Sequence, residues 1–123
     1  MKAVFYVFLG GGTGSVLRYL VQLLINKGIF TAFPLGTFVV NIVGSLLIGM
    51  FYTLSERFSL SAEIRLLLTV GFCGGFTTFS TFSTESLNLL KEELYGTFFL
   101  YAILSIAIGI LCTFAGVWIA KSI

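Results

Sequence analysis

The sequence predicts an all-α membrane protein with four transmembrane helices in each subunit. The first observation is composition: of 123 residues, 58% are hydrophobic and 10% are charged, with a mean hydropathy of +1.08. The second is that the apolar residues form four segments, each reaching the roughly 20 residues that a span needs. The third is that the connections between the segments are too short to hold a soluble domain.

The spans are predicted at about residues 3–26, 33–54, 64–90 and 96–120 of a single domain, 1–123. The first segment does not resemble a signal peptide, because Lys2 is the only charge before it, Arg18 lies inside it and no small-residue cleavage site follows. We therefore expect a multi-pass protein of the plasma membrane, either a bacterial cell membrane or an inner membrane.

Enzymatic chemistry is not expected. The sequence contains no histidine, and its five carboxylate side chains all belong to glutamates. Cys73 and Cys112 lie in separate spans without metal-ligand spacing, which predicts free thiols that pack as small apolar groups. We see no nucleophile–base pair or metal cluster, and we expect no nucleic-acid partner.

The positive charges are divided almost evenly between the two sides of the membrane. The positive-inside rule depends on an excess of lysine and arginine on one side. Here the count is four against two or three, which leaves open a weakly marked fixed topology or insertion in both orientations. The side of the termini carries Lys2, Arg57, Arg65 and Lys121, and the other carries Lys27, Lys91 and, if it extends that way, Arg18.

Three spans carry a polar or small face, which predicts an interior that is not simply apolar. Asn41 is interpreted either as an interhelical hydrogen-bonding residue or as a pore-lining donor, and the other polar faces favour the donor. Arg18 must extend to the interface or find a partner. The faces comprise Gly11, Ser15, Arg18 and Gln22; Thr37, Asn41, Gly44 and Ser45; and Tyr101, Ser105, Gly109 and Cys112.

The third span contains "GFCGGFTTFSTFS", residues 71–83, close to the middle of the membrane. Gly74 and Gly75 followed by Thr77 and Thr78 weaken helix propensity, so we predict a helix broken at its middle rather than a continuous, glycine-packed one. Irregular backbone at that depth needs protein or a water-filled cavity around it. Its freed carbonyls could hold a cation, and the second half-helix could present amides to an anion.

After the predicted break, phenylalanines and hydroxyl residues share one face of the helix: Phe79, Phe82, Ser83 and Ser86. The edge of a phenylalanine ring is electropositive, so these rings could line an anion path without a formal charge. The alternative is that they only pack. Glu85, on a neighbouring face with Thr78, is either an interfacial charge or a buried partner for Arg18.

The segments "GGGTGSVLRY", "GTFVVNIVGS" and above all "GGFTTFSTFS" resemble the Fluc (CrcB-type) fluoride channels, and the resemblance covers the whole chain. It implies a fluoride-selective channel that exports fluoride from the cytoplasm by passive conduction. It also implies an antiparallel, dual-topology homodimer in the lipid bilayer, with two pores and a structural sodium ion at the dimer interface.

The resemblance also implies roles for individual residues. The sodium ion would be held by the backbone carbonyls of Gly74 and Thr77, while Arg18 and Glu85 would be structural or vestibule charges. The residues of the fluoride pore would be Asn41, Phe79, Phe82, Thr37, Ser83, Tyr101 and Ser105.

Two other functions remain in view. A small multidrug-type exporter of dual topology would need a carboxylate within the membrane, and only Glu85 could serve. A noncatalytic subunit of a larger membrane complex would show no activity alone. The fluoride channel agrees better with the residues, because a strongly hydrated ion needs several weak donors and no fixed cation in its pore.

Overall fold

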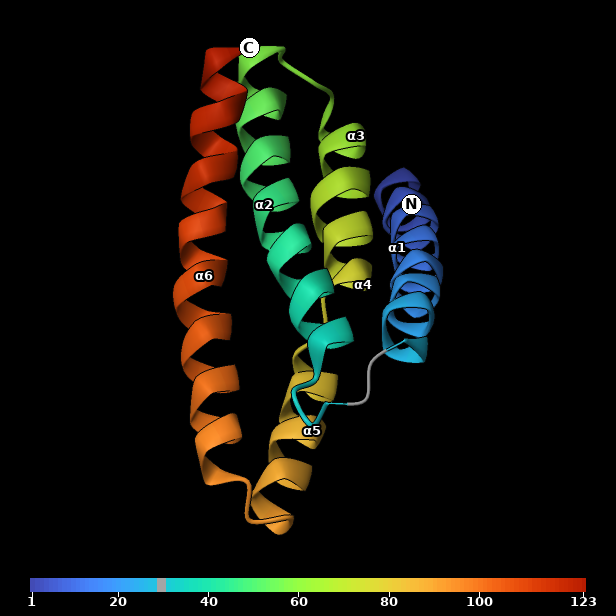
Figure 1. Ribbon diagram of the computed structural model, residues 1–123. Helices are drawn as coiled ribbons and strands as arrows, with labels where there is room; N and C mark the ends of the chain where they lie inside the picture. Colours follow the sequence, from blue (N-terminus) through green and yellow to red (C-terminus); the bar gives the residue numbers. More distant parts are fainter. Residues whose placement is uncertain (29–30) are drawn as a thin grey trace.

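The structure is a computed structural model, and it describes residues 1–28 and 31–123 (Figure 1). Every regular element in these ranges is helical. The third span is divided into four short elements, one of them a π-helical segment, η1. The elements are α1 (Lys2–Lys27), α2 (Leu35–Arg57), α3 (Ala62–Leu66), η1 (Leu67–Cys73), α4 (Gly74–Phe76), α5 (Phe79–Lys91) and α6 (Tyr95–Ser122).

The prediction of an all-helical chain with four apolar spans is confirmed. The stretches Lys2–Lys27, Leu35–Arg57, Ala62–Lys91 and Tyr95–Ser122 are each long and apolar enough to cross a membrane. The shortest, α2, has 23 residues. At about 1.5 Å per residue it extends about 34 Å, more than the roughly 30 Å of a hydrocarbon core. In Figure 1 the C terminus lies at the same end as the α2–α3 connection, opposite the α5–α6 turn.

Glycines allow α1 to contact the third span backbone to backbone. Gly10 and Gly14 are buried. A methyl group at Gly14 would lie 2.9 Å from the backbone nitrogen of Phe76 and would overlap the carbonyl oxygen of Phe72. A methyl group at Gly75 would similarly meet the backbone of α1. The glycines of α1 therefore serve close helix packing.

The α2 and α6 helices form the second closely packed pair. Gly49 is buried, and a methyl group there would overlap the backbone of Thr113. The Thr113 hydroxyl donates to the carbonyl oxygen of Ser45 at 3.1 Å. At the helix ends, Arg57 Nη1 donates to the Ala120 carbonyl oxygen at 2.6 Å, which satisfies an acceptor of the last turn of α6. These contacts fix α2 and α6 relative to each other.

The α-helical backbone of the third span is interrupted after α4. Gly74 keeps helical dihedral angles, φ −62° and ψ −37°. Thr77 and Thr78 are extended, with φ −85°, ψ 160° and φ −150°, ψ 117°, and α5 begins at the next residue. The extended residues are therefore the two threonines, whereas the glycines before them remain helical. Threonine suits this position because its β-branched side chain tolerates extended backbone well.

Candidate functional site

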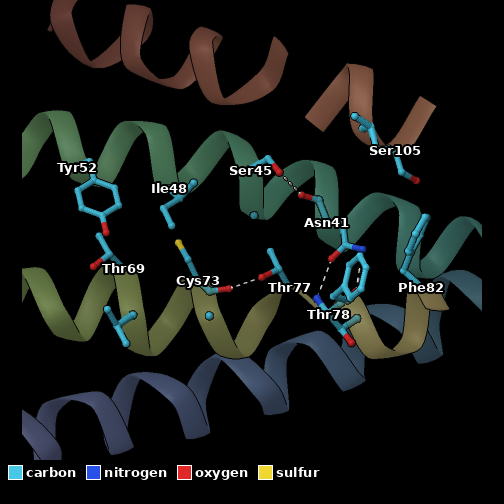
Figure 2. A pocket seen from close by; sticks show the side chains of 15 residues that line it. Asn41, Ser45, Ile48, Tyr52, Thr69, Cys73, Thr77, Thr78, Phe82 and Ser105 are labelled. Carbon is cyan, nitrogen blue, oxygen red and sulfur yellow. Dashed lines mark hydrogen bonds between the residues drawn. The ribbon is translucent and has the colours of Figure 1, made fainter. Parts of the chain in front are cut away.

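A groove of about 580 Å³ lies between α2 and the third span and extends to α6 (Figure 2). It brings together six of the residues predicted from sequence: Asn41, Gly74, Thr77, Phe79, Phe82 and Ser105. The other lining residues are Gly44, Ser45, Ile48, Tyr52, Thr69, Val70, Cys73, Thr78 and Ile106. The groove therefore combines hydroxyls, an amide, aromatic rings and backbone from three spans.

Asn41 holds the interruption in place through both atoms of its amide group (Figure 2). Its Nδ2 donates to the carbonyl oxygen of Thr78 at 3.1 Å, and its Oδ1 accepts from the Thr78 amide at 2.8 Å. Asn41 thus replaces helical partners that the extended Thr78 backbone does not have. The interhelical hydrogen bond considered from sequence is what the structure shows. The pore-donor role of Asn41 stays a prediction.

The interruption releases the carbonyl groups of Gly74 and Thr77. In a continuous α-helix each would accept from the amide four residues later. Instead, the Thr78 amide donates to Asn41, and the Thr81 amide donates to the Thr78 hydroxyl at 3.2 Å, as at the N-cap of a helix. Two oxygen acceptors beside the groove are consequently free of their usual helical donors. Oxygen ligands of this kind suit a hard cation.

The carbonyl of Gly75 is satisfied from the first span. Arg18 Nε donates to it at 3.0 Å, and the Ser15 hydroxyl lies 3.5 Å away. The half-buried guanidinium of Arg18 is thus stabilised by a hydrogen bond to a backbone carbonyl. The Glu85 carboxylate instead accepts a hydrogen bond from the Thr37 hydroxyl. The two charged residues, considered as partners from sequence, are engaged separately.

A second polar cluster takes one side chain from each span. Gln22 Nε2 donates to the Thr37 hydroxyl at 3.0 Å, and that hydroxyl donates to the carboxylate of Glu85. The side chain of Tyr101 is fully buried beside Thr37 and Glu85. Among the described residues, the Tyr101 and Ser105 hydroxyls have no hydrogen-bond partner. Two buried donors on α6 are therefore available to a ligand or to water.

The predicted aromatic face is divided. Phe79 is 79% exposed, its ring lies 5.7 Å from that of Phe82, and the Phe82 ring lies 5.0 Å from that of Tyr101. Phe79 and Phe82 both line the groove. Ser83 is exposed, donates to the Phe79 carbonyl at 3.0 Å and is not a groove-lining residue, whereas Ser86 is buried. The rings and the serines therefore do not form a single surface.

Sequence reasoning missed several functional contacts. Thr78 was placed beside Glu85, but its main role is to cap α5 and to receive both Asn41 hydrogen bonds. A threonine directly before the first residue of a hydroxyl-rich helix was a usable N-cap signal. The Gly75 carbonyl was missed as the acceptor for Arg18, because no sequence pattern reports which carbonyl faces a neighbouring helix.

The fold defines a small multi-pass membrane protein in which polar side chains of α2, the third span and α6 line one groove. Residues 5–117 match the family model described as "CrcB-like protein, Camphor Resistance (CrcB)". The chain belongs to this CrcB family.

Three relatives extend the comparison along the full chain. Proteins named "Fluoride-specific ion channel FluC" from Bacteroides fragilis and Phocaeicola vulgatus are 56% and 57% identical to this chain over 124 and 121 residues. These alignments cover 98% of this chain and 98% and 100% of the two relatives. A protein of the same name from Flavobacterium psychrophilum is 48% identical over 124 residues, which is 100% of both chains. The chain is a multi-pass protein of a bacterial membrane.

We expect Asn41→Leu to destabilise the interruption, because leucine has a similar size but leaves the Thr78 amide and carbonyl without partners. The free energy of unfolding should fall by about 1–3 kcal/mol. Exchange of the Thr78 amide hydrogen should also accelerate. Detergent-titration unfolding and hydrogen exchange of the purified protein measure the two effects.

Ser45→Ala is the matched control, since Ser45 lines the same groove but its hydroxyl only donates to the Asn41 carbonyl within α2, at 2.7 Å. It should leave exchange at Thr78 unchanged. Equal Thr78 exchange in wild type and Asn41→Leu would show that the amide does not hold the interruption.

Proposed function

We propose that this protein is a fluoride-selective channel that exports fluoride from the cytoplasm by passive conduction. The observation that carries the proposal is the interrupted third span, whose extended residues lie beside a groove of donors and aromatic rings. The identity of the ion is supported by relatives named as fluoride-specific channels over 98% or more of this chain. The same names support the expectation that the chain is not an enzyme.

The chemistry of the groove suits a small, strongly hydrated anion. Such an ion must exchange its water for several donors in turn, and each must hold it weakly enough for release. The unpartnered hydroxyl of Ser105 and the ring edges of Phe79 and Phe82 are candidate donors within the groove. The unpartnered hydroxyl of Tyr101, whose ring lies beside that of Phe82, is a further candidate just outside the groove lining. The residues that line the groove include no lysine or arginine, so no fixed cation would trap the anion there.

The direct test is fluoride efflux from liposomes that contain only this protein, with chloride and a protonated drug cation as controls. Fluoride should leave quickly, and neither control solute should. Drug counterflow would instead favour the exporter, in which Glu85 would be the coupling carboxylate. Absence of flux from the chain alone would favour a subunit of a larger complex.

Within this proposal, Phe79 and Phe82 act electrostatically as well as sterically. Isoleucine keeps bulk and apolar character but lacks the electropositive ring edge. Phe79→Ile and Phe82→Ile should each reduce fluoride efflux by about tenfold or more, which corresponds to a barrier increase of about 1.4 kcal/mol.

Phe98→Ile and Phe99→Ile are the matched controls, because both residues lie near the start of α6, outside the groove. They should conduct like wild type. Size-exclusion elution must show the same assembly for all four variants. Normal flux in both Phe79→Ile and Phe82→Ile would refute the anion-path role of the rings.

The assembly is proposed to be an antiparallel homodimer of dual topology with two pores. The near-even charge distribution supports it, as does the surface of α5 in a single copy. There Ser80, Ser83 and Thr84 are exposed together with Phe79. Hydroxyls at this depth are better covered by a second subunit than by lipid.

Dual topology predicts that a reporter fused to the C terminus will be found on both sides of the membrane. Added lysines beside one terminus should shift the chain into one orientation and reduce dimer formation. A reporter accessible from a single side in the unaltered chain would contradict the antiparallel arrangement.

A structural sodium ion at the dimer interface is part of the same proposal. The carbonyls of Gly74 and Thr77 fit this role, because the interruption deprives both of their helical donors. No group of three or more acidic, cysteine or histidine side chains in the described residues could hold a metal ion. Main-chain oxygens are therefore the available ligands, and the ion would supply positive charge beside the interruption.

Replacing sodium on both sides by a large organic cation should lower fluoride flux and thermal stability. Gly74→Val should do the same: within this chain a methyl group at Gly74 meets only the Thr69 carbonyl oxygen, at 3.9 Å, so the loss would not come from a clash inside the subunit. Thr77→Ala is the control, since it keeps the Thr77 carbonyl and should retain the sodium dependence. Unchanged flux and stability without sodium would remove the site from the mechanism.

A further inference from the structure

A cation lies beside one end of the groove, and the proposed fluoride path assigns it no role. Tyr52, Thr69 and Val70 form this end, and Figure 2 shows Tyr52 and Thr69 far from Phe82. The guanidinium carbon of Arg65 lies over the Tyr52 ring, 5.1 Å from its centroid. A positive charge is thus held against a side chain that lines the groove.

Arg65 lies at the boundary of the membrane rather than inside the groove. It is the fourth residue of the third span, roughly 5 Å from its start at helical rise. Its side chain is exposed, and it is not a lining residue. Tyr52 follows Asn41 by eleven residues on α2, so Arg65 lies about 16 Å along the helix from the interruption.

The charge of Arg65 is available to a solute. Glu63 is two residues away on the same helix, a spacing at which side chains do not face each other. No carboxylate of the described ranges forms an ion pair with Arg65, whose guanidinium lies over the Tyr52 ring instead. Stacking on the ring occupies a face of the guanidinium and leaves N–H donors at its edge free.

We infer that Arg65, positioned by Tyr52, attracts small anions to the mouth of the groove, and this inference rests on the proposed channel function. A fixed cation inside the pore would bind fluoride too tightly to pass. At the aqueous mouth the same charge raises the local anion concentration and the entry rate, and solvent screening permits release. Arg65 is a recruiting residue for small monovalent anions in general, while selection for fluoride occurs deeper in the groove.

Salt dependence separates recruitment from a structural role. Screening extends over about 30 Å at 0.01 M ionic strength and about 3 Å at 1 M, so a steering charge matters only in dilute salt. We expect Arg65→Gln to reduce initial fluoride efflux by about three- to tenfold at low ionic strength. Variant and wild type should converge at high ionic strength, with potassium sulfate as the screening salt. Arg65→Lys keeps the charge and should retain most of the wild-type salt dependence.

Lys121→Gln is the matched control, because Lys121 is an exposed cation in the last turn of α6, outside the groove. It should follow wild type at every ionic strength. If wild type conducts and Arg65→Gln shows the wild-type salt profile, or an equal loss at both salt concentrations, the recruiting role is wrong. Absence of fluoride flux in wild type would refute the channel function itself. Failure of the channel function is thus distinguishable from failure of the recruiting role, which requires a conducting wild type.

Discussion

The two hydrogen bonds between the Asn41 amide and the Thr78 backbone are the constraint on which the site depends. Extended residues in the middle of an apolar span would leave amide and carbonyl groups unsatisfied, at a cost of several kcal/mol each in lipid. Asn41 presents one donor and one acceptor from a neighbouring helix, which matches both groups of one residue. A hydroxyl would have to donate and accept through a single oxygen, whereas the amide places its donor and its acceptor on two separate atoms that can meet the two backbone groups at once.

The contacts around the interruption divide its carbonyls into two groups. Arg18 and Ser15 satisfy Gly75, and this is possible because α1 approaches through glycines without Cβ atoms between the backbones. Gly74 and Thr77 lose their helical donors, and no other group of the described residues donates to their carbonyls. The packing of α1 thus decides which carbonyl oxygens of the interruption accept hydrogen bonds within the protein and which remain available to a ligand.

The sequence was sufficient to predict the four spans, because apolar length and short connections leave few alternatives. It also located the unusual segment of the third span, from Gly74 to Thr78, but it could not tell which residues of this cluster leave the helical conformation; in the structure these are Thr77 and Thr78. Helix propensity indicates which residues weaken a helix, but it does not say at which of them the helix will break. The position of the interruption was decided by a tertiary partner, Asn41, whose reach depends on how α2 packs. For the same reason sequence did not reveal that Arg18 bonds to Gly75, or that Ser83 and Ser86 lie apart.

The placement of charge explains how one groove could attract an anion and still release it. Within the groove the polar groups are neutral: hydroxyls, one amide and ring edges. The cations lie around it, with Arg18 bonded to backbone behind the interruption and Arg65 stacked on Tyr52 at one end. A positive potential from outside the path lowers the energy of an anion along the whole groove, whereas a cation within the path would create one deep minimum. A small membrane channel can therefore combine attraction of an anion with its fast passage when the cations lie beside the ion path and do not line it.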